Sequence, residues 1–115
     1  MIERTEENFE KFLQKNIEFD AVLASDYLMA VKNVDMLNAH GIWVQEDVCV
    51  GGFGDGPEAI AKKLTTVGTD VVEVGRRSAR QIIGQIEGLH IRGLTVLSTP
   101  FMERSTCRVR NILEK

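Results

Sequence analysis

The sequence predicts an α/β protein, a three-layer sandwich in which helices cover both faces of a mostly parallel sheet. Short apolar runs alternate with amphipathic segments along the chain, which is the pattern of buried parallel strands joined by helices. The 115 residues are enough for one domain with a real core, and 43% of them are hydrophobic against 27% charged, which is typical of a globular protein.

The first half of the chain predicts two helices and two strands. Phe9, Phe12 and Leu13 recur at helical spacing between polar residues, which indicates an amphipathic helix. Short runs of apolar residues without alternation predict strands that are buried on both faces. The expected elements are a helix over Glu6–Asn16, a strand over Phe19–Ala24, a helix that begins after the caps Ser25 and Asp26 and ends at Gly41, and a strand over Val48–Phe53.

The second half predicts two further helices and two further strands. Pro57 suits the first position of a short helix, and Asp70 and Glu73 have the spacing of a capping box for a longer one. The expected elements are a helix from Pro57 to Lys63, a strand over Leu64–Val67, a helix from Asp70 to Gly88 that buries Val71, Val74, Ile82 and Ile86, a strand over Leu94–Leu97, an extended piece over Phe101–Thr106, and a short helix in the tail Arg108–Lys115.

The charge balance argues against a nucleic-acid-binding surface on this chain. Lys and Arg total 14 against 17 Asp and Glu, a net charge of −3, whereas phosphate binding needs a basic face. We interpret Arg76, Arg77 and Arg80 as the solvated face of a helix. No apolar run approaches the ~18 residues of a membrane span, and the N-terminal segment is too charged for a secretion signal.

These features predict a cytoplasmic protein without a membrane partner. In a reducing compartment the two cysteines, Cys49 and Cys107, are expected to be free thiols, and a single bridge between them is the alternative.

Polar side chains follow three of the predicted strands, at the edge where a parallel α/β sheet binds its ligands. Ser25 and Asp26 follow the first strand, and Asp55 follows the second. Thr69 and Asp70 follow the third. Because the carboxyl ends of parallel strands share one edge, we expect these side chains to line one rim.

Each of these aspartates also precedes a helix, so capping is the alternative to ligand binding. Asp55 suits capping least, because Gly56 and Pro57 follow it. A Mg²⁺ site at the rim would need bound phosphate and a group to hold it, and no lysine ends a strand. The run Gly51–Gly56 fits neither common phosphate-loop pattern, so we interpret it as a sharp turn at the sheet edge.

No residue pattern indicates nucleophilic or metal chemistry. His40 and His90 are isolated, and Cys107 has no neighbouring histidine in the sequence. We therefore predict no catalytic residue, no metal site and no cofactor. Either Tyr27 or Trp43 could stack on a sugar ring, and burial is the expectation for Trp43.

Four stretches occur in an order and with gaps that one protein family shares. They are FDAVLASDYLMAV, GIWVQEDVCVGGFGD, LTTVGTDVVEVGRRSARQIIGQIEG and VLSTPFMERSTC, and together they cover about Phe19 to Cys107. In this combination they resemble the lactose/galactose repressor (LacI/GalR) family. The resemblance implies a periplasmic-binding-protein-like fold. Residues 1–115 would then form a partial C-terminal lobe for effector binding and dimerisation, with the N-terminal lobe and the helix-turn-helix domain absent.

The resemblance also implies a function. In this family a sugar or other small metabolite binds between two lobes, changes how the lobes sit, and so changes the affinity for DNA. DNA would be read only by the missing N-terminal domain. The expected partners are therefore a sugar-like effector and a second copy of the lobe, and no enzymatic activity is expected.

The resemblance places the effector beside residues of the rim. Ser25 and Asp26 match an Asn/Ser-Asp pair next to the effector, and Thr69 and Asp70 match a segment that lines the cleft. Gly54 stands at the first Asp of a Phe-Asp-Asp motif that commonly holds sugar hydroxyls, so ordinary sugar binding would need Asp55 to substitute for it. The predicted effector-binding residues are Ser25, Asp26, Phe53, Asp55, Thr69 and Asp70.

Two functions of other classes remain open. An α/β enzyme fragment could bind a nucleotide or Mg²⁺ through the glycine-rich run and the aspartates. A lobe without its partner could instead act as a self-associating interaction module, because part of its cleft would be exposed.

Overall fold

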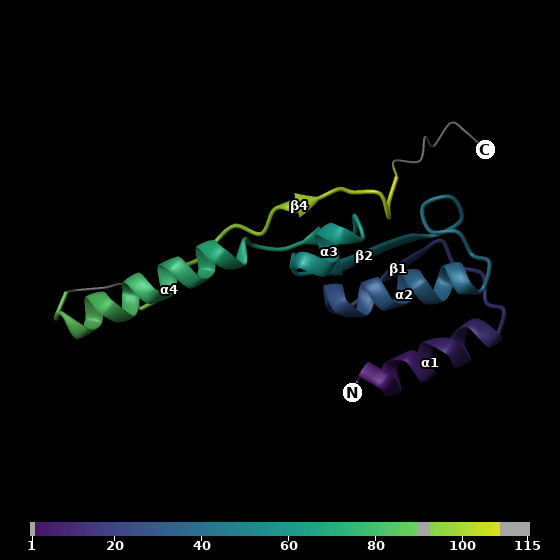
Figure 1. The fold of residues 1–115 in the computed structure, drawn as a ribbon, viewed down its shortest axis with the longest axis horizontal. Coiled ribbons are helices and arrows are strands. Elements are labelled where there is room, and N and C mark those ends of the chain that lie inside the picture. Colours follow the sequence, from purple (N-terminus) through teal and green to yellow (C-terminus); the bar gives the residue numbers. More distant parts are fainter. Residues whose placement is uncertain (1, 90–92, 109–115) are drawn as a thin grey trace.

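The structure, a computed structural model, describes residues 2–89 and 93–108. Helices and strands alternate along the chain, and the strands gather in one sheet (Figure 1). The tail helix expected after Arg108 falls on residues 109–115, outside the described part of the chain. The elements are α1 (Ile2–Gln14), β1 (Ala21–Leu23), α2 (Tyr27–Ala39), β2 (Cys49–Phe53), α3 (Pro57–Ala61), β3 (Thr65–Val67), α4 (Val71–Ile86) and β4 (Phe101–Met102).

The sheet is mostly parallel, as predicted. β1, β2 and β3 are parallel neighbours, and β4 pairs with β3 in the antiparallel direction. The strand expected over Leu94–Leu97 is wrong, because residues 93–100 run back alongside α4, where no strand is available to pair with them (Figure 1). The fourth strand is Phe101–Met102, inside the expected extended piece.

The core lies between the sheet and α2. Gly52 lets the helix approach the strand closely, since a Cβ built on it would lie 2.9 Å from the Cβ of Ala30. Both α1 and α3 pack against α2. The buried hydrophobic residues are Ala24, Ala30, Val34, Leu37, Val48, Val50, Ala59 and Leu64.

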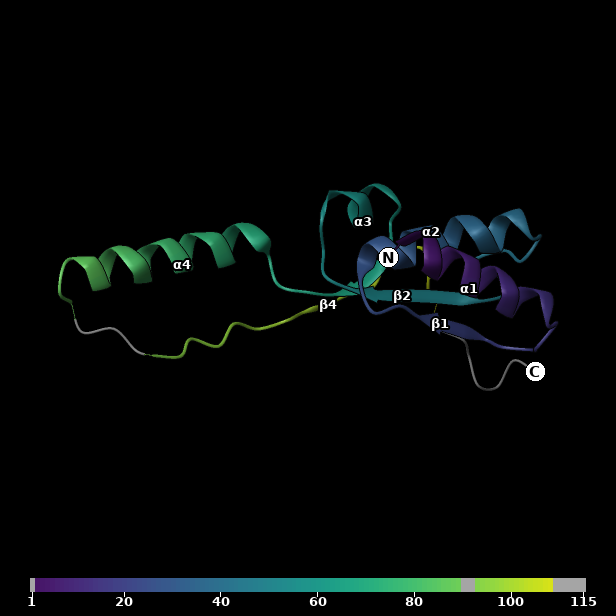
Figure 2. The same cartoon turned by 90° about the horizontal axis from the view of Figure 1, so that it is seen from below.

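The helices α1, α2 and α3 lie on the same side of the sheet (Figure 2). On the other side Leu23, Phe53 and Phe101 are 72%, 47% and 65% exposed. Cys49 faces the same way, because side chains alternate along a strand and its neighbour Val50 points into the core. We call this surface (Leu23, Cys49, Phe53 and Phe101) the open sheet face. The described residues thus form two of the three predicted layers.

α4 projects away from the sheet (Figures 1 and 2). The radius of gyration is 18.5 Å, against about 13 Å for a compact chain of this length. The expected burial of its apolar residues is therefore wrong: Val71, Val74, Ile82 and Ile86 are 62%, 40%, 58% and 79% exposed. Their spacing still places them on one side of the helix. We call these four residues the α4 stripe, and nothing in the described part of the chain covers it.

Smaller features also differ from expectation. α1 begins at Ile2, earlier than the predicted Glu6. Trp43, expected to be buried, is 59% exposed in the connector before β2. None of the described helices combines the length and the apolar composition that crossing a membrane requires.

Candidate functional site

The loops that follow β1, β2 and β3 lie against one another at the carboxyl edge of the sheet. The N–H of Gly54, after β2, donates to the carbonyl of Val67 in β3 over 2.8 Å. A Cβ built on Gly68 would lie 2.9 Å from the backbone of Gly54, and one built on Gly54 would lie 2.9 Å from the ring of Tyr27. The rim is therefore one contiguous surface, and it carries Ser25, Asp26, Asp55, Thr69 and Asp70.

The glycine-rich run packs against the ring of Tyr27, the first residue of α2. A Cβ built on Gly56 would lie 2.2 Å from the Tyr27 hydroxyl oxygen, so a side chain there would collide with the ring. Gly54 has a φ of +91°, a conformation that glycine adopts without strain. Burial raises the pKa of Tyr27, and the Glu58 carboxylate raises it further. The geometry agrees with the interpretation of the run as a turn.

Asp26 and Asp70 both cap helices. Oδ1 of Asp26 accepts a hydrogen bond from the N–H of Met29 over 2.8 Å, and Oδ1 of Asp70 accepts one from the N–H of Val72 over 2.9 Å. Both side chains are exposed, as is Ser25 beside Asp26. Each cap uses only one carboxylate oxygen, so capping and ligand binding are compatible at these two positions.

Asp55 is held by Arg104. The guanidinium donates from Nη1 to Oδ1 over 2.6 Å and from Nη2 to Oδ2 over 2.8 Å, and the Thr66 hydroxyl donates to Oδ1 over 2.9 Å. The Asp55 and Arg104 side chains are 16% and 18% exposed. The Arg104 hydrogen bond holds the pKa of Asp55 below its usual value, against the opposing effect of burial. We call this pair the Asp55–Arg104 clasp, and it already engages both oxygens of the carboxylate.

A cavity of about 310 Å³ opens beside the loop after β3. Thr69 and Asp70 line it, and the Thr69 hydroxyl donates to the carbonyl of Ser98 over 2.8 Å. Glu73 and Arg77 line it as well, joined by a 2.9 Å ion pair. The hydrogen bond from Arg77 lowers the pKa of Glu73. This part of the rim therefore offers a hydroxyl and charges of both signs.

The other predicted residues lie elsewhere on the surface. Asp26 and Tyr27 line a separate, mostly apolar cavity of about 330 Å³. Phe53 faces the open sheet face, beside Val67 and Phe101 in the strand register. On this chain the structure therefore does not bring all six predicted residues into one cavity.

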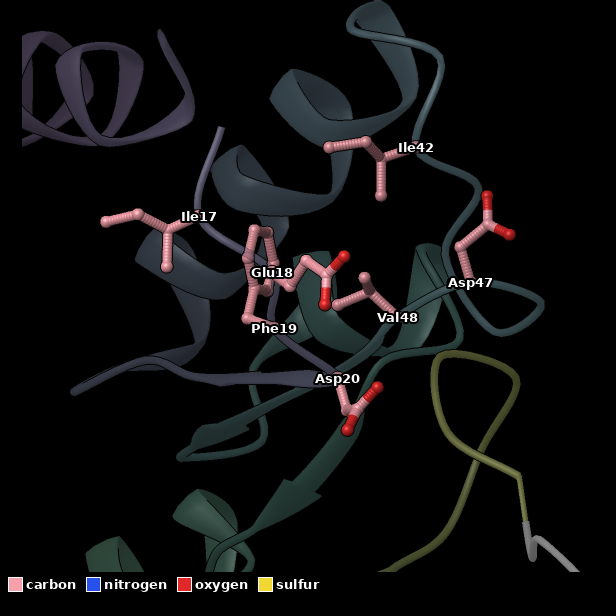
Figure 3. Close-up of a pocket in the computed structure, with 7 residues that line it drawn as sticks. All are labelled: Ile17, Glu18, Phe19, Asp20, Ile42, Asp47 and Val48. Atoms are coloured by element: carbon pink, nitrogen blue, oxygen red, sulfur yellow. The ribbon is translucent and has the colours of Figure 1, made fainter. Parts of the chain in front are cut away.

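Another cavity, of about 550 Å³, lies at the opposite edge of the sheet (Figure 3). Its residues precede β1 and β2 rather than follow them, so it shares none of the predicted site. Among the described residues no group of three or more His, Cys, Asp and Glu is arranged to hold a metal ion. The lining residues are Ile17, Glu18, Phe19, Asp20, Ile42, Asp47 and Val48.

Sequence reasoning missed Arg104 as the partner of Asp55. The two residues are 49 positions apart, so no local spacing connects them. The available signal was chemical, since an acidic residue next to a buried strand needs a cation or several donors to remain charged. The stretch VLSTPFMERSTC contained that cation.

Comparison with known proteins agrees with this architecture. A family model described as a periplasmic binding protein-like domain matches residues 2–107. A curated relative, an HTH-type transcriptional regulator of Mycobacterium tuberculosis, is 34% identical over 71 residues, which are 62% of this chain and 20% of the relative.

Two solved structures share the fold. A LacI family transcriptional regulator from Arthrobacter sp. FB24, in complex with lactose, matches with a TM-score of 0.80 and 29% identity, over 94% of this chain and 42% of that one. The lac repressor dimer bound to operator and the anti-inducer ONPF matches with a TM-score of 0.76 and 22% identity, over 94% and 37%. This chain spans about a fifth of the curated relative and less than half of each of these two solved chains. The chain therefore belongs to the periplasmic binding protein-like domain family, and over most of its length it is similar to part of a LacI family transcriptional regulator.

Proposed function

We propose that this chain forms one wall of an effector site in a LacI-type transcriptional repressor, as part of its C-terminal lobe. A sugar or related small metabolite binds between this lobe and a second one, by hydrogen bonds and without covalent chemistry. The observation that carries the proposal is the contiguous carboxyl edge formed by the loops after β1, β2 and β3. DNA is contacted in the cytoplasm by a helix-turn-helix domain outside these residues, and the ligand alters that contact by linkage.

Asp26 and Asp70 are the carboxylates best suited to hold ligand hydroxyls. Their caps use one oxygen each, whereas the clasp engages both oxygens of Asp55. Gly54 stands where the family resemblance implies the first Asp of a Phe-Asp-Asp motif, so that carboxylate is missing. The ring of Tyr27 lies beside Gly54. The lactose bound to the Arthrobacter regulator supports a sugar as the class of ligand.

The α4 stripe supports a second lobe as the neighbour of this one. Ile82 and Ile86 are 58% and 79% exposed. The apolar side of an amphipathic helix normally packs against the rest of its domain. This chain spans 42% of the Arthrobacter regulator. In a longer polypeptide of that kind, α4 and residues 93–100 would pack on the second lobe and join the two walls of the cleft.

Calorimetry on the full-length repressor against a panel of mono- and disaccharides, lactose included, tests the proposal. Asp26→Asn keeps a good helix cap but removes the charge, so it isolates the ligand contact. We expect the affinity to fall about tenfold or more, as for the loss of a charged hydrogen bond. Asp47→Asn, in the cavity at the opposite edge, is the control and should leave the affinity unchanged. An unchanged affinity in Asp26→Asn would contradict the assignment.

Of the other functions, self-association has a specific observation in its favour, the exposed α4 stripe. We propose that the 115-residue chain pairs with a second copy when no second lobe covers the stripe. The nucleotide-binding alternative loses its main support, because Tyr27 and the turn account for Gly54 and Gly56.

A further inference from the structure

The return of the chain after β4 places Cys107 beside Cys49. After β4, which pairs with β3, the chain turns at Ser105 and Thr106 and reaches β2. The N–H of Val50 donates to the carbonyl of Thr106 over 2.9 Å, and the Thr106 hydroxyl donates to the carbonyl of Val50 over 2.7 Å. These two bonds hold Thr106, the residue before Cys107, against Val50, the residue after Cys49.

The environment of the two thiols agrees with this placement. Sγ of Cys107 lies 3.4 Å from the carbonyl oxygen of Val50, the residue that follows Cys49. Both cysteines are half-buried, and both line a cavity of about 200 Å³ on the open sheet face. Burial raises the pKa of the Cys107 thiol, a hydrogen bond with Thr65 lowers it, and the neighbouring Cys49 raises it again. The two side chains therefore interact directly.

This geometry is compatible with a covalent bond. The Cys49 and Cys107 side chains hydrogen-bond to each other, so their two sulfur atoms are already neighbours. We propose that Cys49 and Cys107 are a redox modification site that closes to an intramolecular disulfide when the protein meets a small-molecule disulfide such as oxidised glutathione.

The reaction is two thiol–disulfide exchanges. The thiolate of one cysteine attacks a sulfur of oxidised glutathione, which forms a mixed disulfide and releases one glutathione thiolate that takes up the proton. The second cysteine, as its thiolate, attacks the protein sulfur of the mixed disulfide and releases the second glutathione. Two protein thiols are oxidised, and one molecule of oxidised glutathione is reduced to two of glutathione.

The bond would tie the segment that carries Arg104 to β2. It closes a loop from Cys49 to Cys107 that includes Asp55 and the whole α4 extension. A cross-link over such a loop restricts the unfolded chain more than the folded one, so the oxidised form should be the more stable.

The test is mass spectrometry of the wild-type chain after equilibration with reduced and oxidised glutathione. The intact mass should fall by two hydrogen atoms. Tryptic digestion without reduction should give a cross-linked product of residues 33–62, which contain Cys49, and residues 105–108, which contain Cys107. The Tm should rise by about 5 °C or more on oxidation and return with a reductant.

Cys49→Ser and Cys107→Ser are the matched controls. Each retains one thiol and should give a glutathione adduct without a cross-link. Oxidation of the wild type in concentrated urea supplies the reference for chance closure, and the folded protein should form the bond about tenfold or more readily. The proposal is overturned if the folded wild type yields only glutathione adducts or intermolecular disulfides, or if folding gives no advantage over urea.

Discussion

The Asp55 and Arg104 side chains are 16% and 18% exposed, so removing either one leaves the other as a poorly hydrated, unpaired charge. We expect Arg104→Ala to lower the free energy of unfolding by about 3 kcal/mol, measured by urea denaturation. Lys32→Ala is the matched control, because it breaks an exposed 3.0 Å ion pair with Glu6 and should cost less than about 1 kcal/mol. Equal losses in the two variants would mean that the clasp behaves as a surface pair.

The clasp also gives the stability a pH dependence of defined sign. Arg104 keeps the pKa of Asp55 below its usual value in the folded state, so the unfolded chain binds the proton first as the pH falls below about 4. The stabilisation that the clasp provides is complete above the pKa of Asp55 in the unfolded chain. It is lost as the pH falls through the lowered pKa of Asp55 in the folded state. Urea midpoints of the wild type and Asp55→Asn should therefore converge between pH ~6 and ~3. A gap that stays constant over this range would contradict the prediction.

At the scale of helices and strands, we expect a change from glycine to alanine to have opposite effects on stability at two positions, Gly52 in β2 and Gly75 in α4. Gly52→Ala would place a Cβ 2.9 Å from the Cβ of Ala30 and 3.3 Å from the carbonyl of Asp26, so α2 would have to move off β2. We expect a loss of about 1–3 kcal/mol in thermal unfolding. Gly75→Ala meets nothing within 4 Å and should stabilise α4 by about 0.5–1 kcal/mol. Destabilisation of the same size in both variants would argue against close packing of α2 on β2.

At the scale of the whole molecule, the extended shape and the α4 stripe predict self-association of this chain. The radius of gyration is 18.5 Å, and Ile82 and Ile86 are 58% and 79% exposed. Sedimentation velocity should show a species larger than the monomer whose share rises with concentration, since association buries the apolar area. Ile82→Lys should shift the equilibrium toward monomer. Arg80→Gln, on the opposite side of α4, should leave it unchanged, and a wild-type chain that is monomeric at every concentration would refute the proposal.

Local spacing predicted much of the fold. The caps at Asp26 and Asp70 and the end of α2 near Gly41 depend on contacts within one helical turn, so a short stretch of sequence is enough to place them. The apolar runs also predicted β1, β2 and β3 and the rim residues that follow them. Parallel neighbours follow from the alternation of strands with helices, because such connections return each strand in the same direction.

The sequence by itself determined the α/β class, the family resemblance and the edge of the sheet where we propose the site. Only the tertiary structure decided that Arg104 occupies the carboxylate of Asp55, that Cys107 lies beside Cys49, and that α4 leaves its stripe exposed. The physical reason is sequence separation. Periodicity and capping report interactions among near neighbours, whereas pairing across tens of residues depends on how the strands return, and an apolar side of a helix does not specify which surface will cover it.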